Sequence, residues 1–152
     1  AGFTDFLVEI GGEVVAAGLR PDGLPWRVGI NRPNPEAGVN EVYKVVALKD
    51  RAFATSGDYR QFFTQGGIRY SHIIDPRTGY PVTHRVVSVS ILAEDCTLAD
   101  GLATAVMVMG AEKGLALIDR MEGVEGLIVV EMPDGRLREH ASQGILFEPA
   151  PR

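Results

Sequence analysis

Residues 95–110 of the chain, DCTLADGLATAVMVMG, mark the point at which its hydrophobic pattern changes. Apolar residues recur here at three- and four-residue spacing, which is the spacing of one face of an α-helix. Asp95 is well placed as the N-cap, and Gly110 follows the last periodic residue. The pattern therefore predicts a helix that ends at Gly110. A second helix is predicted over about residues 111–121.

The chain on either side of this point is rich in β-forming residues. The runs 6–10 and 14–17 are separated by Gly11-Gly12-Glu13, which has the length and glycine content of a hairpin or bulge. Further strands are predicted at 26–30, 42–49, 51–55, 71–74, 86–92 and 126–130, with a tight turn at 134–135. Strands, then two helices, then strands again predict an α+β fold, with a mainly antiparallel sheet and both helices packed on one face.

The composition favours one globular domain over residues 1–152, because 45% of the residues are hydrophobic and can form a continuous core. Only the tail 148–152, with two prolines, is expected to fray. The net charge is -5 and no basic block occurs, so we do not expect nucleic acid as a partner. The lone Cys96 rules out an intrachain disulfide and is expected to be a small buried side chain.

No apolar run approaches the roughly 20 residues of a membrane span, and no secretory signal pattern opens the chain. The first residues already follow a strand pattern and include no initiator Met. We therefore expect the sequence to begin inside a longer protein.

Asp100 and Thr104 stand one turn apart on the predicted helix, so a carboxylate and a hydroxyl project from the same side. Two hard oxygens so placed suit Mg²⁺, which is commonly shared with substrate phosphates. The alternative is a polar helix edge, with the Thr104 hydroxyl bonded back to a backbone carbonyl. Because the neighbouring side chains are nearly all apolar, Asp100 is expected to be buried and to need a cation or donors.

His72 lies at the end of a predicted strand that runs into the turn-rich stretch 75–81, DPRTGYP. Histidine is the side chain best suited to move a proton near neutral pH. A histidine at a strand end is also commonly structural, with its ring nitrogens bonded to backbone groups. His84 and His140, in turn-like polar settings, are expected to be structural.

Two residues of the turn itself have alternative roles. Asp75 is expected to cap an Asx-type turn ahead of Pro76. Arg77 is either a solvated surface charge or a contact to a ligand phosphate.

Two turns of small residues would let a planar ligand approach the backbone closely. The first, ATSGDY at 54–59, contains Ser56 and Gly57. The second places Glu13 after two glycines, where its carboxylate could accept hydrogen bonds from a ligand. Both can equally be ordinary turns. The motifs of P-loop, Rossmann, α/β-hydrolase and zincin proteins are missing from the sequence. The sequence therefore gives no motif evidence for any of these four protein classes.

Four segments occur in an order that matches a known family: FLVEIGGEV at 6–14, ATSGDYRQFF at 54–63, YSHIIDPRTGYPV at 70–82 and CTLADGLATAVMVMG at 96–110. They resemble the successive signature blocks of the ApbE flavin transferases, and PWRVGI at 25–30 also fits. The resemblance extends over about residues 5–121. It implies an ApbE-like, T-fold-like arrangement of the predicted α+β fold.

The resemblance implies that FAD and Mg²⁺ are used to attach FMN covalently to a threonine of a target flavoprotein, with release of AMP. On the matching positions it implies Asp100 and Thr104 as Mg²⁺ ligands and His72 as the residue that activates the threonine. It also implies a set of FAD-binding positions, namely Glu13, Ser56, Gly57 and Ile74.

A family block resembling DLGxIAKGYAVD, which supplies a further metal ligand and a lysine near FAD, is absent from this sequence. The chain is therefore expected to be the C-terminal portion of an ApbE-like protein, to hold about half of the site and to be inactive alone. Two alternatives remain open. One is a module that binds FAD or a partner without transfer, and the other is a domain used only for association.

The resemblance also implies a location and a kind of partner. Members of the family are usually exported to the periplasm or cell envelope, often as lipoproteins, and serve flavoproteins of respiratory or redox complexes. Contact with a membrane is expected only through a possible lipid anchor upstream.

Overall fold

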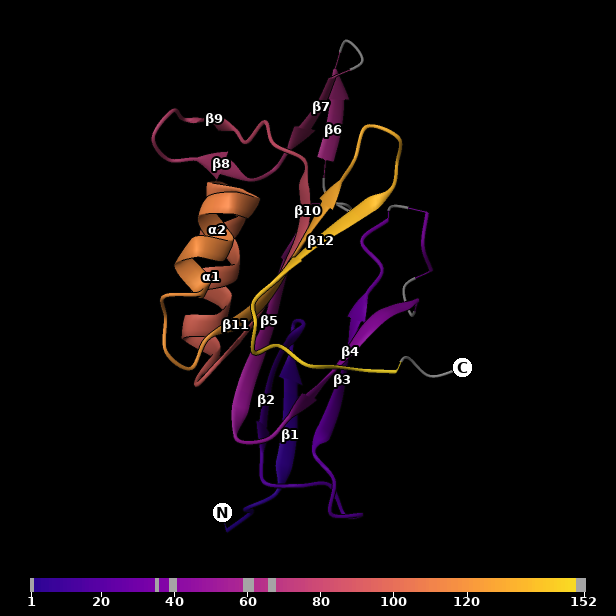
Figure 1. The fold of residues 1–152 in the computed structure, drawn as a ribbon, viewed down its shortest axis with the longest axis vertical. Helices are drawn as coiled ribbons and strands as arrows, with labels where there is room; N and C mark the ends of the chain where they lie inside the picture. The colour runs from indigo at the N-terminus through magenta and orange to yellow at the C-terminus, as the bar shows by residue number, and fades with distance from the viewer. Residues whose placement is uncertain (1, 35, 39–40, 59–61, 66–67, 150–152) are drawn as a thin grey trace.

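The computed structural model describes residues 2–34, 36–38, 41–58, 62–65 and 68–149, with side chains left out for 62–69. Its main sheet has six antiparallel strands in the order β1-β2-β5-β10-β11-β12. Their bounds are Phe6–Ile10 (β1), Glu13–Ala17 (β2), Arg51–Gly57 (β5), Val86–Ala93 (β10), Glu125–Glu131 (β11) and Leu137–Ala141 (β12). Figure 1 shows these strands running along the length of the molecule.

The described residues also form three smaller sheets. One has the order β13-β4-β3, and the pairs β6-β7 and β8-β9 form two-stranded ribbons. The bounds are Trp26–Asn31 (β3), Val42–Leu48 (β4), Phe62–Gln65 (β6), Ile68–Ser71 (β7), Ile74–Asp75 (β8), Tyr80–Pro81 (β9) and Phe147–Glu148 (β13). The two helices, α1 at Cys96–Met109 and α2 at Ala111–Ile118, lie together along one side of the molecule (Figure 1).

The main sheet is the middle of three layers. On one face its side chains form a core cluster with the helices, in which Ala54 and Ile91 meet Met107. On the other face a second cluster joins Phe53 and Leu92 to Leu48 of the β13-β4-β3 sheet. All eight residues of β10 are buried, because both faces of this central strand are covered.

Local features of the sequence account for the bounds of α1. The Asp95 carboxylate accepts a hydrogen bond from the Leu98 N–H at 2.9 Å, as an N-cap does. Gly110 has a positive φ of 82°, which glycine adopts without steric cost, and its N–H donates to the Val106 carbonyl. The predicted cap and end of this helix are confirmed, and so is the α+β class with both helices on one face.

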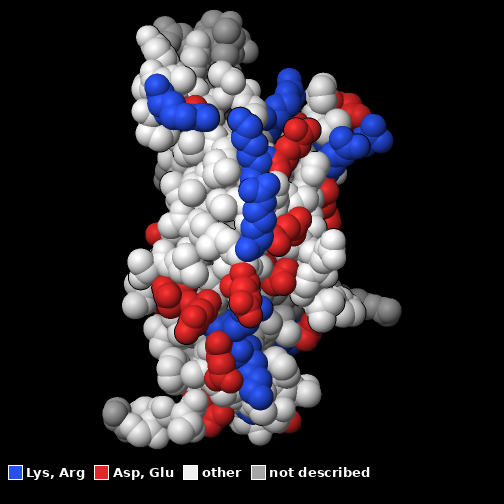
Figure 2. All heavy atoms as spheres, turned by 60° about the vertical axis from the view of Figure 1, so that its left-hand side comes forward, with Lys and Arg blue, Asp and Glu red and all other residues white. Residues whose placement is uncertain are grey.

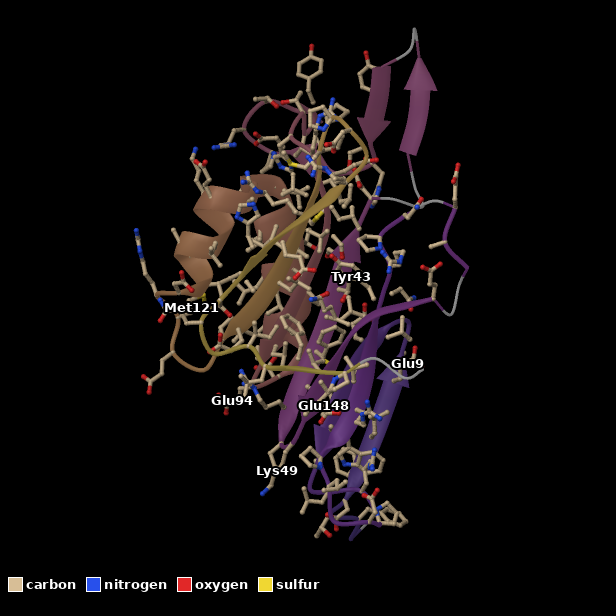
Figure 3. The ribbon with its side chains drawn as sticks, turned by 45° about the vertical axis from the view of Figure 1, so that its right-hand side comes forward. Glu9, Tyr43, Lys49, Glu94, Met121 and Glu148 are labelled. Carbon is tan, nitrogen blue, oxygen red and sulfur yellow. The ribbon has the colours of Figure 1, made fainter. Side chains whose placement is uncertain are left out.

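Several predicted boundaries shift. The second helix ends at Ile118, and residues 119–121 continue as a turn. The strand predicted at 71–74 divides into β7 and β8, leaving His72 between strands. Glu148, the first residue of the tail predicted to fray, is ordered in β13, which pairs with β4, and forms an ion pair of 2.6 Å with Arg27 (Figure 3). Residues 150–152 of that tail lie outside the described residues. No helix in the described ranges is long and apolar enough to cross a membrane.

Candidate functional site

The structure brings together Ser56 of β5 and Thr104 of α1, whose hydroxyl oxygens lie 3.1 Å apart. Side chains alternate along a strand, so Ala52, Ala54 and Ser56 all face the helix. The two alanines pack in the same cluster as Ala103 of α1 and allow the helix to approach closely. Thr104 therefore bonds to a hydroxyl of the sheet, which differs from the backbone carbonyl considered as an alternative from the sequence.

Asp100 is exposed, so the prediction that it is buried is wrong. The side chains that α1 buries are Ala99, Ala103, Val106 and Met107. Asp100 follows Ala99 by one position, about 100° around the helix, and so points out of the core. An exposed carboxylate needs no buried partner and remains accessible to a ligand from solution.

Glu13 and Asp100 are near the same thiol. Cys96, at the start of α1, lies 3.5 Å from the Val14 carbonyl of β2 and can donate to it. Burial raises the pKa of Cys96, and the carboxylates of Glu13, Asp95 and Asp100 raise it further. The start of β2, which carries Glu13, thus lies beside the first turns of α1, with Cys96 between them. Cys96 is half-buried, less covered than the buried side chain predicted from the sequence.

The segment that carries His72 and Ile74 is held in place by the residue between them. Ile73 packs on the core cluster under the helices, and its carbonyl accepts a hydrogen bond from the Val82 N–H at 3.0 Å. Its own N–H donates to the Ser71 hydroxyl. His72 and Ile74 flank this anchor and are both exposed, with 48% of Ile74 accessible.

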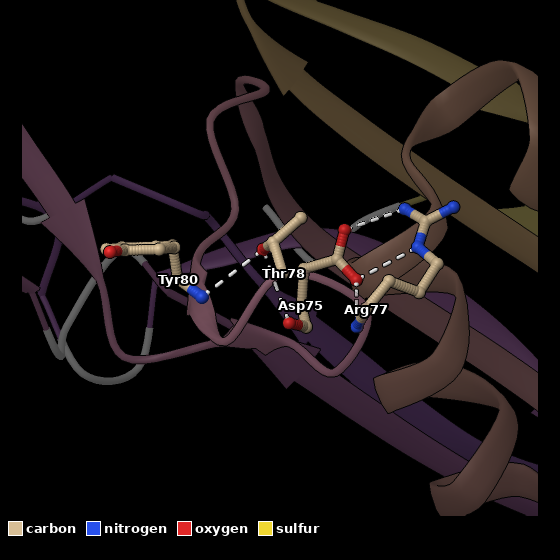
Figure 4. A network of polar contacts seen from close by, with 4 residues as sticks. All are labelled: Asp75, Arg77, Thr78 and Tyr80. Atoms are coloured by element: carbon tan, nitrogen blue, oxygen red, sulfur yellow. Dashed lines mark hydrogen bonds and ion pairs between the residues drawn. The ribbon is translucent and has the colours of Figure 1, made fainter.

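The loop after Ile74 is closed by Asp75 (Figure 4). The carboxylate of Asp75 accepts hydrogen bonds from the Arg77 N–H and Nε at 2.9 Å each and from Nη2 at 2.7 Å. The Asp75 carbonyl accepts from the N–H groups of Thr78 and Gly79. The predicted Asx-type cap at Asp75 is confirmed. Bonds from the Arg77 side chain, then from its backbone, lower the pKa of Asp75 to about 2.

Sequence reasoning did not find a cavity of about 710 Å³ at the start of β10. Buried polar side chains line it, among them Asp58 and Ser71. The ring of His84 also lines it, with a buried Nε2 atom that has no hydrogen-bond partner among the described residues. Most of the lining is the run 80–87, and Asp58, Ser71 and Glu131 are brought to it from other parts of the chain. The sequence does not show that these segments enclose a cavity. His84 is expected from the sequence to have its nitrogens bonded, yet within the described part of the chain only Nδ1 accepts a bond, from the Val86 N–H.

Gly57 has no side chain and can contribute only its backbone, which pairs with Ser88 in the β5–β10 ladder. Within the ranges that the structure describes, no group of three or more His, Cys, Asp and Glu side chains is arranged to hold a metal ion. Asp100 and Thr104 therefore supply at most part of a coordination shell. On the side seen in Figure 2, acidic and basic side chains are interspersed over the surface.

Comparison with known proteins matches residues 1–128 to the ApbE family. The FAD:protein FMN transferase of Vibrio cholerae is 47% identical over 148 residues, which are 97% of this chain and 42% of that protein. The protein of the same name from Treponema pallidum is 43% identical over 92% of this chain and 39% of its own length. The chain thus spans less than half of the relatives that it matches.

Comparison with solved structures also matches this chain to ApbE flavin transferases. The flavin transferase ApbE from Vibrio cholerae superimposes with a TM-score of 0.78 at 46% identity, over 93% of this chain and 43% of that one. The apo form of the Pseudomonas stutzeri flavinyl transferase ApbE gives a TM-score of 0.76 at 42% identity, over 93% and 42% of the two chains.

Proposed function

Because this chain belongs to the ApbE family, we propose that it serves the transfer of FMN from FAD to a target protein. The observation that carries the proposal is the hydroxyl pair of Ser56 and Thr104, one helical turn from the exposed Asp100. This arrangement contains three oxygen-bearing side chains from β5 and α1, all within residues 1–128, which match the family. The names of the relatives supply the substrate, FAD, and the kind of acceptor, a protein.

The residues present fit part of a Mg²⁺ site. Asp100 offers a carboxylate and Thr104 a hydroxyl, and both are hard oxygen ligands of the kind that Mg²⁺ prefers. When bound, the ion would neutralise the oxygens of the FAD pyrophosphate during phosphoryl transfer. Asp100 and Thr104 would orient the pyrophosphate beside α1, and Ser56, bonded to Thr104, would fix the rotamer of that hydroxyl.

His72 is proposed as the base for the acceptor. Its ring would take the proton from the threonine hydroxyl as the threonine oxygen bonds to the FMN phosphorus. The bond from that phosphorus to the bridging oxygen breaks, and AMP leaves with this oxygen. The anchored Ile73 would hold His72 and the flavin-facing Ile74 in fixed positions. The proposed acceptor is a flavoprotein of a redox complex in the cell envelope.

The experiment uses a chimaera in which this chain replaces the matching part of the Vibrio cholerae transferase. The chimaera is mixed with FAD, Mg²⁺ and a target protein that carries the acceptor threonine. Transfer is measured as flavin fluorescence that stays with the target through denaturing electrophoresis. We expect His72→Ala to reduce labelling by about 10²–10⁴-fold while FAD binding is retained, and Asp100→Ala to reduce both.

Glu112→Ala, which removes an exposed carboxylate from α2, is the matched control and should label normally. If His72→Ala or Asp100→Ala labels as well as the unchanged chimaera, the role given to that residue is wrong. A chimaera that binds FAD but labels nothing, beside an active Vibrio cholerae enzyme, would favour a binding module. The chain alone is expected to give no labelled target.

A further inference from the structure

Ser71 is buried directly beside the exposed His72. Strand β7 ends at Ser71 and β8 begins at Ile74, so His72 and Ile73 connect the two strands. Ser71 is 5% exposed, whereas His72 is open to solvent. Consecutive residues of an extended chain point to opposite sides, which agrees with this difference. A substrate that reaches His72 from solution therefore meets the imidazole and not the Ser71 hydroxyl.

The Ser71 hydroxyl closes a turn around His72. It accepts a hydrogen bond from the Ile73 N–H at 3.1 Å. A serine that bonds to the backbone two residues ahead forms an ST turn, which restricts the φ and ψ angles of the residue in between. That residue is His72, so the bond acts on the backbone from which the imidazole projects.

Both partners of this hydrogen bond are fixed in the fold. Ser71 belongs to β7, which pairs with β6. The Ile73 carbonyl accepts from the Val82 N–H at 3.0 Å, and the Ile73 side chain packs on the core cluster beneath the helices. His72 therefore lies between two fixed residues, and the Ser71 hydroxyl is the group that joins them across it.

We propose that Ser71 is a positioning residue for the transfer reaction, because its buried hydroxyl fixes the direction in which His72 presents its imidazole to the acceptor threonine. A general base must lie about 2.6–3.2 Å from the group whose proton it removes. A displacement of about 1 Å can lower a rate by about 10²-fold. The inference rests on the proposed role of His72 as the base and adds a residue that acts through it.

Labelling of the target protein by the chimaera measures the effect. We expect Ser71→Ala to lower the rate of labelling at saturating FAD and acceptor by about 10–10²-fold. Binding of FAD should be unchanged. Ser71→Thr keeps the hydroxyl, and the cavity of about 710 Å³ that Ser71 lines has room for the extra methyl group, so this variant should restore labelling.

A double-mutant cycle separates positioning from a general effect on the fold. In the His72→Ala background, Ser71→Ala should cause no further loss of the residual labelling, because the residue through which it acts is gone. Losses that multiply in the double variant would overturn the proposal. Ser71→Cys keeps nearly the same volume but accepts hydrogen bonds only weakly, so it serves in the same cycle if Ser71→Ala does not fold.

Amide hydrogen exchange tests the turn without reference to activity. The Ile73 N–H should exchange at least about tenfold faster in Ser71→Ala than in the unchanged chimaera, because the donor loses its acceptor. Ser142→Ala is the matched control. Ser142 is 6% exposed, and its hydroxyl also accepts from a backbone N–H, that of Gly126 at the start of β11. This control should leave both the labelling and the exchange of Ile73 unchanged.

The results distinguish this inference from the proposed function. Loss of labelling in His72→Ala together with normal labelling in Ser71→Ala would overturn the role of Ser71 alone. Equal exchange of the Ile73 N–H in Ser71→Ala and the unchanged chimaera would do the same. Normal labelling in His72→Ala would instead refute the proposed base, and the role of Ser71 with it.

Discussion

At the scale of single residues, Arg77 is hydrogen-bonded within its own loop, to Asp75. Its backbone N–H and guanidinium all donate to the Asp75 carboxylate, while its side chain stays 68% exposed. Of the two roles considered from the sequence, a solvated charge or a phosphate contact, neither includes this partner. A phosphate would have to compete with Asp75 for the guanidinium.

The Asp75 pKa gives a prediction for pH. It is about 2 in the folded protein and 3.8 for an ordinary aspartate, so the folded state holds the proton less tightly. The pair therefore stabilises the fold above the ordinary pKa, and this contribution is lost as the pH falls from 3.8 toward 2. We expect Arg77→Ala to return the Asp75 pKa toward 3.8, as measured by NMR titration of the carboxyl carbon.

Arg136→Ala is the matched control, because Asp134 and Arg136 form the same kind of pair two residues apart in the β11–β12 turn. It should raise the Asp134 pKa and leave that of Asp75 unchanged. An Asp75 pKa that stays near 2 in Arg77→Ala would show that the guanidinium is not its cause.

Residues also show where the sequence was insufficient. The i, i+4 spacing correctly put Asp100 and Thr104 on one side of α1, but the burial of Asp100 was inferred from apolar neighbours in sequence. Those neighbours lie around the whole helix, and only the set that includes Ala99 and Ala103 faces the sheet. The partner of Thr104, Ser56, lies 48 residues away, and no local pattern connects them.

At the scale of elements, two helical glycines make a matched pair. A Cβ at Gly114 of α2 would lie 2.5 Å from Val106 Cγ1 of α1, so this glycine lets the two helices meet. A Cβ at Gly101 of α1 would meet no atom of the described residues within 4 Å, apart from its chain neighbours and the backbone of its own helix.

We expect Gly114→Ala to lower the free energy of unfolding by about 1–3 kcal/mol, because Val106 must shift in a packed core. Gly101→Ala should raise it by about 0.5–1 kcal/mol, since alanine loses less backbone entropy in a helix. Urea unfolding of both variants measures the difference. Equal stability in the two would mean that the helices have space to separate at Gly114.

Helices and strands with a strong hydrophobic periodicity were predictable from the sequence. Short strands that depend on hydrogen bonds from a neighbouring strand were not. The helical repeat and the cap at Asp95 identified α1, and alternating or continuous apolar runs identified most strands of the main sheet. The missed strands are short: β9 and β13 have two residues each, and β6 has four. β12, LREHA, is an edge strand with few apolar residues. Such strands form because a neighbour offers hydrogen bonds, which the local sequence does not show.

At the scale of the whole molecule, a polar clasp joins β12, at the edge of the main sheet, to β4, the central strand of the β13-β4-β3 sheet. Tyr43 of β4 (Figure 3) donates to Glu139 of β12 at 2.5 Å, and Lys44 forms an ion pair of 3.0 Å with the same carboxylate. Burial, then the bond to Glu139, raises the pKa of Tyr43 to about 12. Burial alone would raise the pKa of Glu139, but the bonds from Tyr43 and Lys44 outweigh it, and this pKa is lowered.

A double-mutant cycle measures the clasp. We expect Tyr43→Phe to lower the free energy of unfolding by about 0.5–1.5 kcal/mol, the range for one hydrogen bond, and Glu139→Ala, which also removes the ion pair with Lys44, to lower it by at least as much. Their effects should be less than additive, because each removes the same contact. Arg138→Gln, at an exposed neighbouring position of β12, should leave stability nearly unchanged. Strict additivity would mean that Tyr43 and Glu139 do not interact in solution.

Strand β10, VVSVSILA, carries no charge or proline, and every one of its eight side chains is covered in the folded molecule. Short uncharged segments rich in β-branched residues are those that stack between copies into cross-β fibrils once they are freed. The two layers that flank β10 thus also prevent this amyloid-prone segment from pairing with other copies of the chain. Heating beyond the unfolding transition should therefore lead to thioflavin-positive aggregates, and a charge placed in β10 would suppress them in the unfolded chain.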